Sequence, residues 1–353
     1  MGEFKVLSLF NGISCGKLAL ERAGINVDRY VSYEIDQYAN QIAKKNYPND
    51  EYLGDVSDAD FTQYKGFDLV IGGSPCTYWS ISKNGRETTS EGIGFELFSH
   101  FVRAVKESEC KYFLYENNFS IHKNIKAAIT EALRVEPIMI NSSLVSAQSR
   151  KRMYWTNIPG VKQPKDKGIL LKDIVLDDVD PVALHNLYGG FKEKSVRVFE
   201  DKSPTIRTAA GGGHTPSFVK KGLLHTQNAI DYMNRQVADG RNHWDFAHHS
   251  DIKDDKSATV VANFFKGVPY NVFKDWDCIR KFHPIECERL QTLPDDWTEG
   301  ISNTQRYKCI GNGWTVDIIA HIFKNIPESA KNAENCEIIE FPTKIDKSEN
   351  IAS

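Results

Sequence analysis

The sequence predicts an α/β fold with a doubly wound, mostly parallel sheet and a smaller subdomain that is loop-rich and partly β. Three observations predict it. Short β-prone runs alternate with helical patterns over about the first 160 residues. The connections between them are short, as in βαβ units whose helices cover both faces of a parallel sheet. The alternation then stops, and residues 159–277 are rich in Gly, Asn, His, Asp and Lys.

The predicted strands and helices follow one another along most of the first part of the chain. The strands are Lys5–Phe10, Arg29–Glu34, Phe67–Gly73, Lys111–Asn117, Pro137–Val145 and Arg152–Thr156, with a further short run before Asp55. The helices are Ser14–Ala23, Asp36–Asn46, Phe95–Glu107, Lys123–Leu133, Ile279–Leu293 and Trp314–Phe323. We therefore expect a main domain over residues 1–158, an inserted subdomain over 159–277, helices that complete the main domain over 278–326, and a charged tail over 327–353.

Composition and charge exclude several classes of protein. The chain has 353 residues, 41% of them hydrophobic and 26% charged, which is ordinary for a globular protein. No apolar run approaches the roughly 20 residues of a membrane span, and the N-terminus has no secretory pattern. We therefore expect a cytoplasmic protein without membrane contact. A net charge of −3 opposes bulk attraction to nucleic acid but leaves room for a local basic face.

The cysteines fit neither a disulfide scaffold nor a zinc site, because their number is odd and no C-x-x-C pair occurs. The seven are Cys15, Cys76, Cys110, Cys278, Cys287, Cys309 and Cys336. His243, His248 and His249 have no cysteine partner at a standard spacing, so no metal is expected. Six of the seven thiols are expected to be small buried side chains, and Cys76 is the exception.

Three features at successive strand ends point to one nucleoside pocket. The first strand runs into the glycine turn Phe10-Asn-Gly-Ile-Ser-Cys-Gly16, which lacks the pyrophosphate pattern G-x-G-x-x-G. The second strand ends in Glu34, at a place where an acid commonly binds ribose hydroxyls. Asp55 follows the short third run. Taken singly, each feature is equally compatible with a structural turn or a solvated acid.

Cys76 and Glu116 end the next two strands at the same predicted edge. Gly72-Gly-Ser-Pro-Cys-Thr-Tyr-Trp-Ser80 places the thiol on a rigid loop, and Glu116-Asn-Asn118 follows the next strand. In an extended segment, Gln148, Arg150 and Arg152 share one face. Two guanidinium groups near a cysteine would favour its thiolate and bind a phosphate or a carbonyl oxygen. The alternative for Glu116, and for the segment with Arg150 and Arg152, is that its charged side chains are solvated at a strand end and have no function.

These motifs, in this order, resemble the DNA (cytosine-5)-methyltransferase family over most of the chain. The matching segments are Phe10–Gly16, Pro75-Cys76, Glu116-Asn117, Gln148-x-Arg-x-Arg152, Pro284–Gln291 and Gly311-Asn-Gly-Trp314. The resemblance implies a Rossmann-like S-adenosylmethionine-dependent methyltransferase, with residues 159–277 as its target-recognition subdomain. Ser-Pro-Cys, Glu91-Gly-x-Gly94 and Gly-x-Gly-Trp-Thr-Val look like the animal de novo enzymes, although we expect a bacterial or phage source.

The resemblance also implies the role of individual residues. Residues expected to bind S-adenosylmethionine, and S-adenosylhomocysteine as product, are Phe10, Gly12, Ser14, Gly16, Glu34, Ile35, Asp55, Asn312 and Trp314. In the implied mechanism Cys76 attacks C6 of cytosine, and Glu116 hydrogen-bonds to or protonates N3. Arg152, together with Arg150, would hold the oxygen at C2.

The target atom is inaccessible in a stacked duplex, so the resemblance implies double-stranded DNA as partner and a flipped-out cytosine. Expected DNA contacts are Ser80, Lys83, Arg86, Gln148 and Arg207. We expect a monomer that serves restriction-modification, with a cognate endonuclease, or phage self-protection. Its place would be the cytoplasm of a bacterial cell or of a phage-infected host.

Two departures from the family pattern leave alternatives open. Asn118 stands where the family usually has Val, and Gly313-Trp314 stands where it has Ser-Val. These positions keep open the transfer of another carbon group to cytosine. A catalytically silent DNA-binding homologue is a further alternative, which the intact Cys76, Glu116 and Gln148-x-Arg-x-Arg set opposes. A tRNA substrate is disfavoured, because the Pro-Pro-Cys-Gln and Cys-Phe-Thr motifs of those relatives are absent from the sequence.

Overall fold

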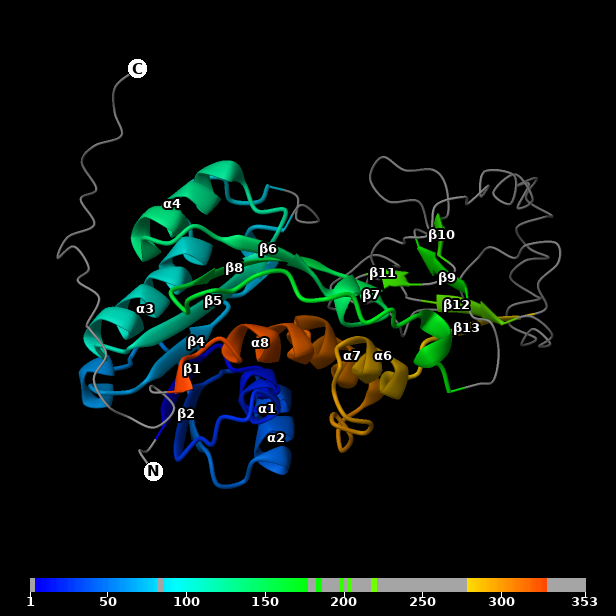
Figure 1. Cartoon of the computed structure of the whole chain (residues 1–353), viewed down its shortest axis with the longest axis horizontal. Coiled ribbons are helices and arrows are strands. Elements are labelled where there is room, and N and C mark those ends of the chain that lie inside the picture. The colour runs from blue at the N-terminus through cyan, green and yellow to red at the C-terminus, as the bar shows by residue number, and fades with distance from the viewer. Residues whose placement is uncertain are drawn as a thin grey trace, which may run out of the picture.

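The main body of the protein is a seven-stranded sheet covered by helices on both faces (Figure 1). The computed structural model describes residues 4–80, 85–176, 182–185, 197–199, 202–204, 217–220 and 278–328. The strand order is β3-β2-β1-β4-β5-β8-β6, and within this sheet β8 alone runs against its neighbours. The strands are β1 (Lys5–Leu9), β2 (Arg29–Tyr33), β3 (Glu51–Leu53), β4 (Leu69–Gly72), β5 (Tyr112–Asn118), β6 (Ile138–Asn141) and β8 (Lys151–Thr156). The predicted doubly wound, mostly parallel sheet is confirmed.

Alternate residues of the buried strands belong to two different hydrophobic cores. On β4, Leu69 and Ile71 pack with α1 (Cys15–Arg22), whereas Val70 packs with α3 (Ile93–Glu107). The first core also includes α2 (Gln37–Asn46) and α8 (Val316–Phe323), and the second includes α4 (Lys123–Leu133). Strands buried on both faces therefore explain the unbroken apolar runs of the sequence.

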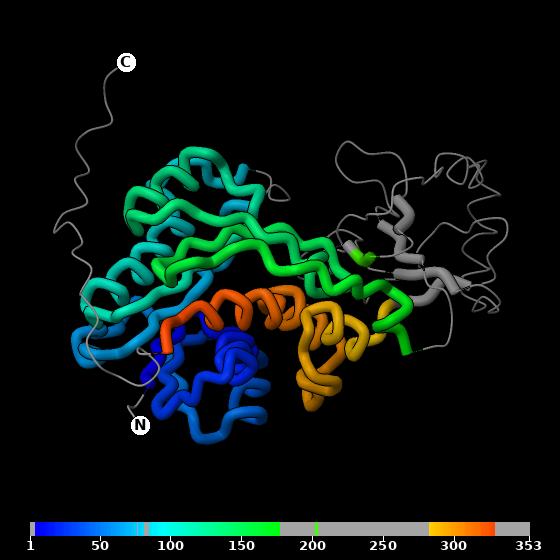
Figure 2. Tube along the Cα trace, in the orientation of Figure 1, coloured from blue at the N-terminus to red at the C-terminus, as the bar shows by residue number. Residues whose placement is uncertain are grey.

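The C-terminal helices return to the first helix of the chain. In Figure 2, α8 lies beside α1 although nearly 300 residues separate them, and both contribute to the same core. Gln291, at the end of α6 (Pro284–Leu290), donates from Nε2 to the carbonyl of Ile310 in α7 (Asn303–Asn312) at 3.0 Å. The helices between 284 and 323 thus complete the main body.

One predicted element is wrong, and one was missed. The sequence predicted a single helix over Ile279–Leu293, but Cys278–Lys281 forms the strand β13, and only Pro284–Leu290 is helical. Pro284 and the His283 cap explain the late start, because proline is favoured in the first turn and removes a backbone donor. Helix α7 carries few large apolar residues in a clear period, which is why no pattern predicted it.

A second, four-stranded antiparallel sheet has the order β10-β9-β12-β13. Its strands are β9 (Val182–His185), β10 (Arg197–Phe199), β12 (Ser217–Lys220) and β13 (Cys278–Lys281). The short β11 (Ser203–Pro204) pairs instead with β7 (Gln148–Ser149), beside the main sheet. Nearby, the buried Lys202 ammonium donates to the carbonyls of Ser143 and Ile169 at 2.8 and 2.6 Å.

Candidate active site

The loop after β1 has an unusual backbone that its own side chains hold in place. Phe10, Gly12 and Ser14 have φ angles of 57°, 58° and 61°, a left-handed conformation that is costly for residues other than glycine. The buried Asn11 amide accepts from Tyr30 Oη and donates to Ser14 Oγ, each at 2.9 Å. This loop is therefore shaped before any ligand binds.

The Glu34 carboxylate joins the loop after β1 to the start of α2. Its Oε2 accepts from the backbone N–H of Gly12 at 2.8 Å, and its Oε1 accepts from Ile35 and Asp36 at 2.9 and 2.8 Å. The Ile35 side chain is 74% exposed, so an apolar surface is open beside this acid. An acid beside an open apolar surface matches the predicted ribose and adenine contacts in its chemistry.

Asp55 and Gly16 both lie at this end of the sheet, but Asp55 is exposed and Gly16 is buried. The exposed Asp55 accepts from the Ser57 N–H at 2.9 Å, and this hydrogen bond holds the pKa of its carboxyl below the usual range. At Gly16 a Cβ would overlap Ile71 Cδ1. Glycine there allows α1 to pack directly on β4, so its contribution to a ligand site is indirect.

The loop carrying Cys76 is fastened to β5. Cys76 begins the short 3-10 helix η2 (Cys76–Tyr78), immediately after β4. Ser74 Oγ and Tyr115 Oη share a hydrogen bond of 2.6 Å, and Asn117 Nδ2 donates to the Ser74 carbonyl at 3.3 Å. Because β4 and β5 pair in parallel, the prediction that Cys76 and Glu116 follow neighbouring strands is confirmed.

Two side chains from distant segments hold the buried Glu116 carboxylate. Arg152 Nε on β8 lies 2.9 Å from its Oε1. The indole Nε1–H of Trp314, between α7 and α8, donates to its Oε2 at 3.0 Å. The structure brings together two residues that the sequence assigned to one site, Glu116 and Arg152, although their contact with each other was not predicted. It also adds Trp314, which the sequence placed only at the cofactor.

Gln148 and Arg150 are buried against the C-terminal helices. Gln148 Nε2 donates to the Leu290 carbonyl at 3.0 Å, and Arg150 donates to the carbonyls of Gly311 and Gly313 at 3.2 and 3.1 Å. These contacts hold the segment before Trp314 beside the sheet. Asn312, predicted at the cofactor, is exposed at the end of α7.

The segment after η2 folds back on the end of β5. Arg86 donates to the Ser120 carbonyl at 2.7 Å, so its guanidinium fixes this segment. Glu87 Oε2 accepts from the buried Trp79 indole at 3.0 Å and from the Gly94 N–H at 3.1 Å. The partly buried Ser80 ends this described stretch. Two predicted DNA contacts, Lys83 and Arg207, lie outside the described residues.

Four cysteines are buried, and three of them are poor nucleophiles because burial disfavours their thiolates. Burial raises the pKa of the Cys15 thiol to about 11 and those of Cys110 and Cys309 to about 12. Cys287 is likewise buried and free of a disulfide.

In the described part of the chain, no cluster of three or more His, Cys, Asp or Glu residues is arranged to hold a metal ion. Nor does any helix there have the length and apolar character to cross a membrane.

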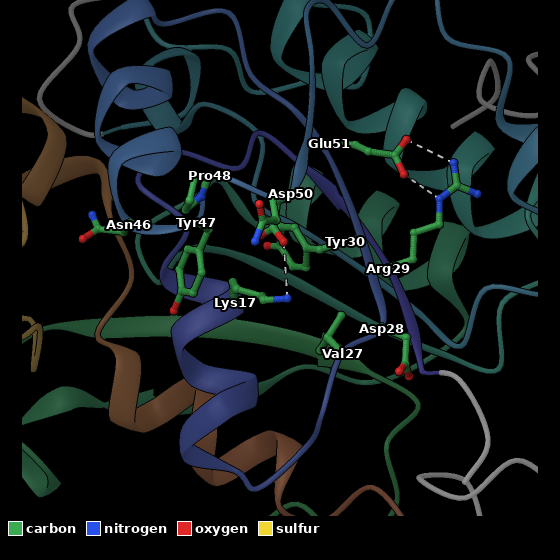
Figure 3. A pocket seen from close by; sticks show the side chains of 11 residues that line it. Lys17, Val27, Asp28, Arg29, Tyr30, Asn46, Tyr47, Pro48, Asp50 and Glu51 are labelled. Carbon is green, nitrogen blue, oxygen red and sulfur yellow. Dashed lines mark hydrogen bonds and ion pairs between the residues drawn. The ribbon is translucent and has the colours of Figure 1, made fainter.

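A separate cavity of about 400 Å³ opens at the amino ends of β2 and β3 (Figure 3). Lys17 Nζ lies 3.4 Å from Asp50 Oδ1 there and packs over the rings of Tyr30 and Tyr47. The cavity contains none of the predicted site residues. It lies at the edge opposite to Glu34 and Glu116, and it is not part of the candidate active site.

A family model for C-5 cytosine-specific DNA methylases matches residues 4–328 of this chain. The chain belongs to that family. The family acts on cytosine in DNA.

Curated relatives cover nearly the whole chain. The orphan methyltransferase M.SPRI of Bacillus phage SPR is 26% identical over 95% of this chain and 100% of its own length. The type II methyltransferase M.HhaI of Haemophilus parahaemolyticus is 25% identical over 92% of this chain and 94% of its own. Both names describe methyltransferases, as the motifs predicted.

Solved structures show the same fold. A mutant of DNMT2 from Spodoptera frugiperda has a TM-score of 0.59 and 19% identity, covering 92% of this chain and 99% of that one. The Entamoeba histolytica methyltransferase EhMeth has a TM-score of 0.59 and 14% identity, with 92% and 98% covered. At these identities the likeness concerns the fold alone.

Proposed function

We propose that this protein transfers a methyl group from S-adenosylmethionine to C5 of a flipped-out cytosine in duplex DNA, through covalent attack by Cys76. One observation carries the proposal: the loop of Cys76 is fastened beside a buried Glu116 carboxylate that Arg152 and Trp314 hold. A cysteine, an acid and a guanidinium at one sheet edge are the groups that addition to a pyrimidine ring requires.

The residues at the ends of β1 to β3 fit S-adenosylmethionine. The rigid loop over Phe10–Ser14, the Glu34 acid and the exposed Ile35 offer a backbone turn, an acceptor for ribose hydroxyls and an apolar surface for a base. Asp55 and Asn312 are exposed polar groups at the same end of the sheet. When bound, this cofactor supplies an electrophilic methyl group, and no metal is needed for that chemistry.

The side chains of this protein would then act in sequence. The Cys76 thiolate adds to C6 of cytosine, while Glu116 holds a proton at N3 so that negative charge does not accumulate on the ring. The electron pair at C5 forms the new bond to the methyl group, whose bond to sulfur breaks and leaves S-adenosylhomocysteine. Water then takes the C5 proton, the electron pair of that C–H bond restores the C5–C6 double bond, the Cys76 thiolate leaves C6, and the N3 proton returns to Glu116. Arg152 lies 2.9 Å from Glu116 Oε1, and its guanidinium would also hold the cytosine oxygen at C2.

Several finer features belong to the same proposal. Residues 1–158 and 278–326 would form the catalytic part, and 159–277 would recognise the DNA sequence. Arg86, with Lys83 and Arg207, would contact DNA, whereas burial of Gln148 favours an indirect role. Relatives are named both orphan and type II methyltransferases, so both phage self-protection and restriction-modification with an endonuclease are consistent with them. We propose a monomer acting in the host cytoplasm.

The direct test is methylation of a random-sequence duplex library followed by bisulfite sequencing. We expect conversion-resistant cytosines within one short sequence context, and none with Cys76→Ala, because the thiolate is the nucleophile. Cys110→Ala, which removes a buried thiol of raised pKa outside the site, serves as the matched control. Near-normal turnover of Cys76→Ala would exclude the covalent route. Nucleoside mass spectrometry of the product distinguishes a methyl group from any other carbon group.

A further inference from the structure

The indole of Trp314 lies between the first turn of α1 and the buried acid of β5. Its Nε1 lies 3.0 Å from Glu116 Oε2, and its Cζ3 would lie 3.4 Å from a Cβ placed on Gly16. On the opposite side, a Cβ on Gly73 would lie 3.3 Å from Nε1 and 3.1 Å from Glu116 Oε2. The hydrogen bond is therefore enclosed by close packing from the Cys76 loop.

The backbone on both sides of Trp314 is fixed. The Gly313 carbonyl accepts from Arg150 at 3.1 Å and from Gln291 Nε2 at 3.2 Å. Thr315 Oγ1 donates to Gln291 Oε1 at 2.8 Å and accepts from Ser142 Oγ, also at 2.8 Å. The backbone that carries the indole therefore cannot shift without breaking several buried hydrogen bonds.

The two donors of Glu116 have different consequences for its geometry. Arg152 alone, at Oε1, would let the carboxyl group rotate about its terminal bond, because that torsion is broad. A second N–H at Oε2 defines the plane of the carboxyl group. A carboxylate has about four lone-pair sites, so two donors still leave sites for a proton and a ring nitrogen.

We propose that Trp314 is a positioning residue for the methyl-transfer reaction: its indole N–H sets the plane in which Glu116 meets cytosine N3. This role rests on the proposed function. It differs from the cofactor contact that the sequence suggested, because Trp314 acts through the Glu116 carboxylate. The role depends on the indole N–H, which donates the hydrogen bond. A phenylalanine would fill the same space without the donor.

The test is Trp314→Phe, measured by steady-state kinetics with DNA and S-adenosylmethionine each varied to saturation. Hydrogen bonds to charged groups are strong, so we expect kcat to fall about 10- to 100-fold while both KM values stay within about threefold. Trp155→Phe is the matched control, because it removes an indole donor to Thr130 Oγ1 (2.9 Å) at another place in the fold. It should leave kcat unchanged. A raised KM for the cofactor with normal kcat would overturn the proposal.

A double-mutant cycle separates positioning from a general structural effect. In a Glu116→Ala background, Trp314→Phe should hardly change the residual single-turnover rate, because its acceptor is gone. If Trp314→Phe lowers the rate by the same factor in the Glu116→Ala background as in the wild type, the proposal is contradicted. If Trp314→Phe does not fold, Gly73→Ala perturbs the same hydrogen bond from the other side and should also lower kcat alone. Active wild-type protein with an unaffected Trp314→Phe overturns only this inference, whereas inactive wild-type protein overturns the proposed function.

Discussion

Two acids at the same edge of the sheet are held in opposite ways. Glu34 accepts three hydrogen bonds, all from backbone N–H groups between residues 12 and 36. Glu116 accepts from two side chains, Arg152 and Trp314, the second of which lies 198 residues away. The hydrogen bonds of Glu34 form within one local turn. Those of Glu116 form only when segments far apart in the sequence have packed together.

This difference separates binding from chemistry. Backbone donors are present whatever side chain a residue carries, proline excepted, so the hydrogen bonds to Glu34 depend less on residue type than those to Glu116. Side-chain donors can be adjusted one at a time, and the Glu116 end combines groups from β5, β8 and the segment before α8. We expect substitutions at Glu34 to change cofactor binding and local stability, and substitutions around Glu116 to change the rate of the chemical step.

The largest expected effect is that of Glu116→Gln. The amide keeps the size of the side chain but cannot supply a proton to N3, so kcat should fall by about 10²- to 10⁴-fold, the usual range for general acid catalysis. Single-turnover methyl transfer at saturating cofactor measures it. Glu288→Gln is the control, because Glu288 is also a buried acid paired with an arginine, Arg306 at 2.9 Å, outside the site. If Glu116→Gln has the kcat of the wild type, Glu116 does not supply a proton in the reaction, and it no longer differs from Glu34 in this respect.

The second effect concerns Glu34→Ala, which leaves three backbone N–H groups without their acceptor. We expect a loss of unfolding free energy of about 1–3 kcal/mol and a higher KM for S-adenosylmethionine, with little change in kcat at saturation. Denaturant unfolding and cofactor titration measure the two. Glu51→Ala, which removes an exposed partner of Arg29 in a neighbouring strand, is the control. A large drop in kcat would mean that this acid also takes part in the chemistry.

The same contrast explains how far the sequence could predict the site. The Glu34 side could be predicted, because the loop, the acid and the strand ends are local features. That Cys76 and Glu116 belong to neighbouring strands could be predicted from the order of strands and the carboxyl-edge rule. The contact of Arg152 with Glu116 could not, because β8 runs antiparallel to β5. The role of Trp314 could not, because its hydrogen bond depends on how α7 and α8 pack against the sheet.

Errors in the predicted fold have the same origin. The apolar period over Ile279–Leu293 is helical, yet its first residues pair with β12, since tertiary pairing overrides local preference. Gln148 and Arg150 illustrate the converse: the shared face was predicted from strand geometry, but the partners on that face, Leu290 and Gly313, come from the far end of the chain. Residue type alone does not distinguish a guanidinium that holds backbone from one that holds substrate.

The smallest expected effect lies between the two regions, where Asp36 caps α2 and pairs with Lys308 of α7 at 2.6 Å. Burial by itself would raise the pKa of Asp36, but hydrogen bonds from Lys308, Ala39 and Tyr38 outweigh it and hold that pKa below its usual value. A carboxyl whose pKa is lowered on folding stabilises the fold above its unfolded pKa, about 3.9, and loses that contribution as pH falls through the folded value.

Asp36→Asn keeps a capping oxygen and removes the charge, so the cost should stay below about 1 kcal/mol, as for partly exposed ion pairs. Thermal unfolding from pH 7 to pH 2 should show a constant deficit above about pH 4 that disappears in acid, because the wild-type carboxyl is then neutral too. Glu51→Gln, at the exposed Arg29 pair, provides the comparison for a charge removed without a cap. If Asp36→Asn still has a lower melting temperature than the wild type at pH 2, the loss comes from the helix cap of α2 and not from the ion pair with Lys308.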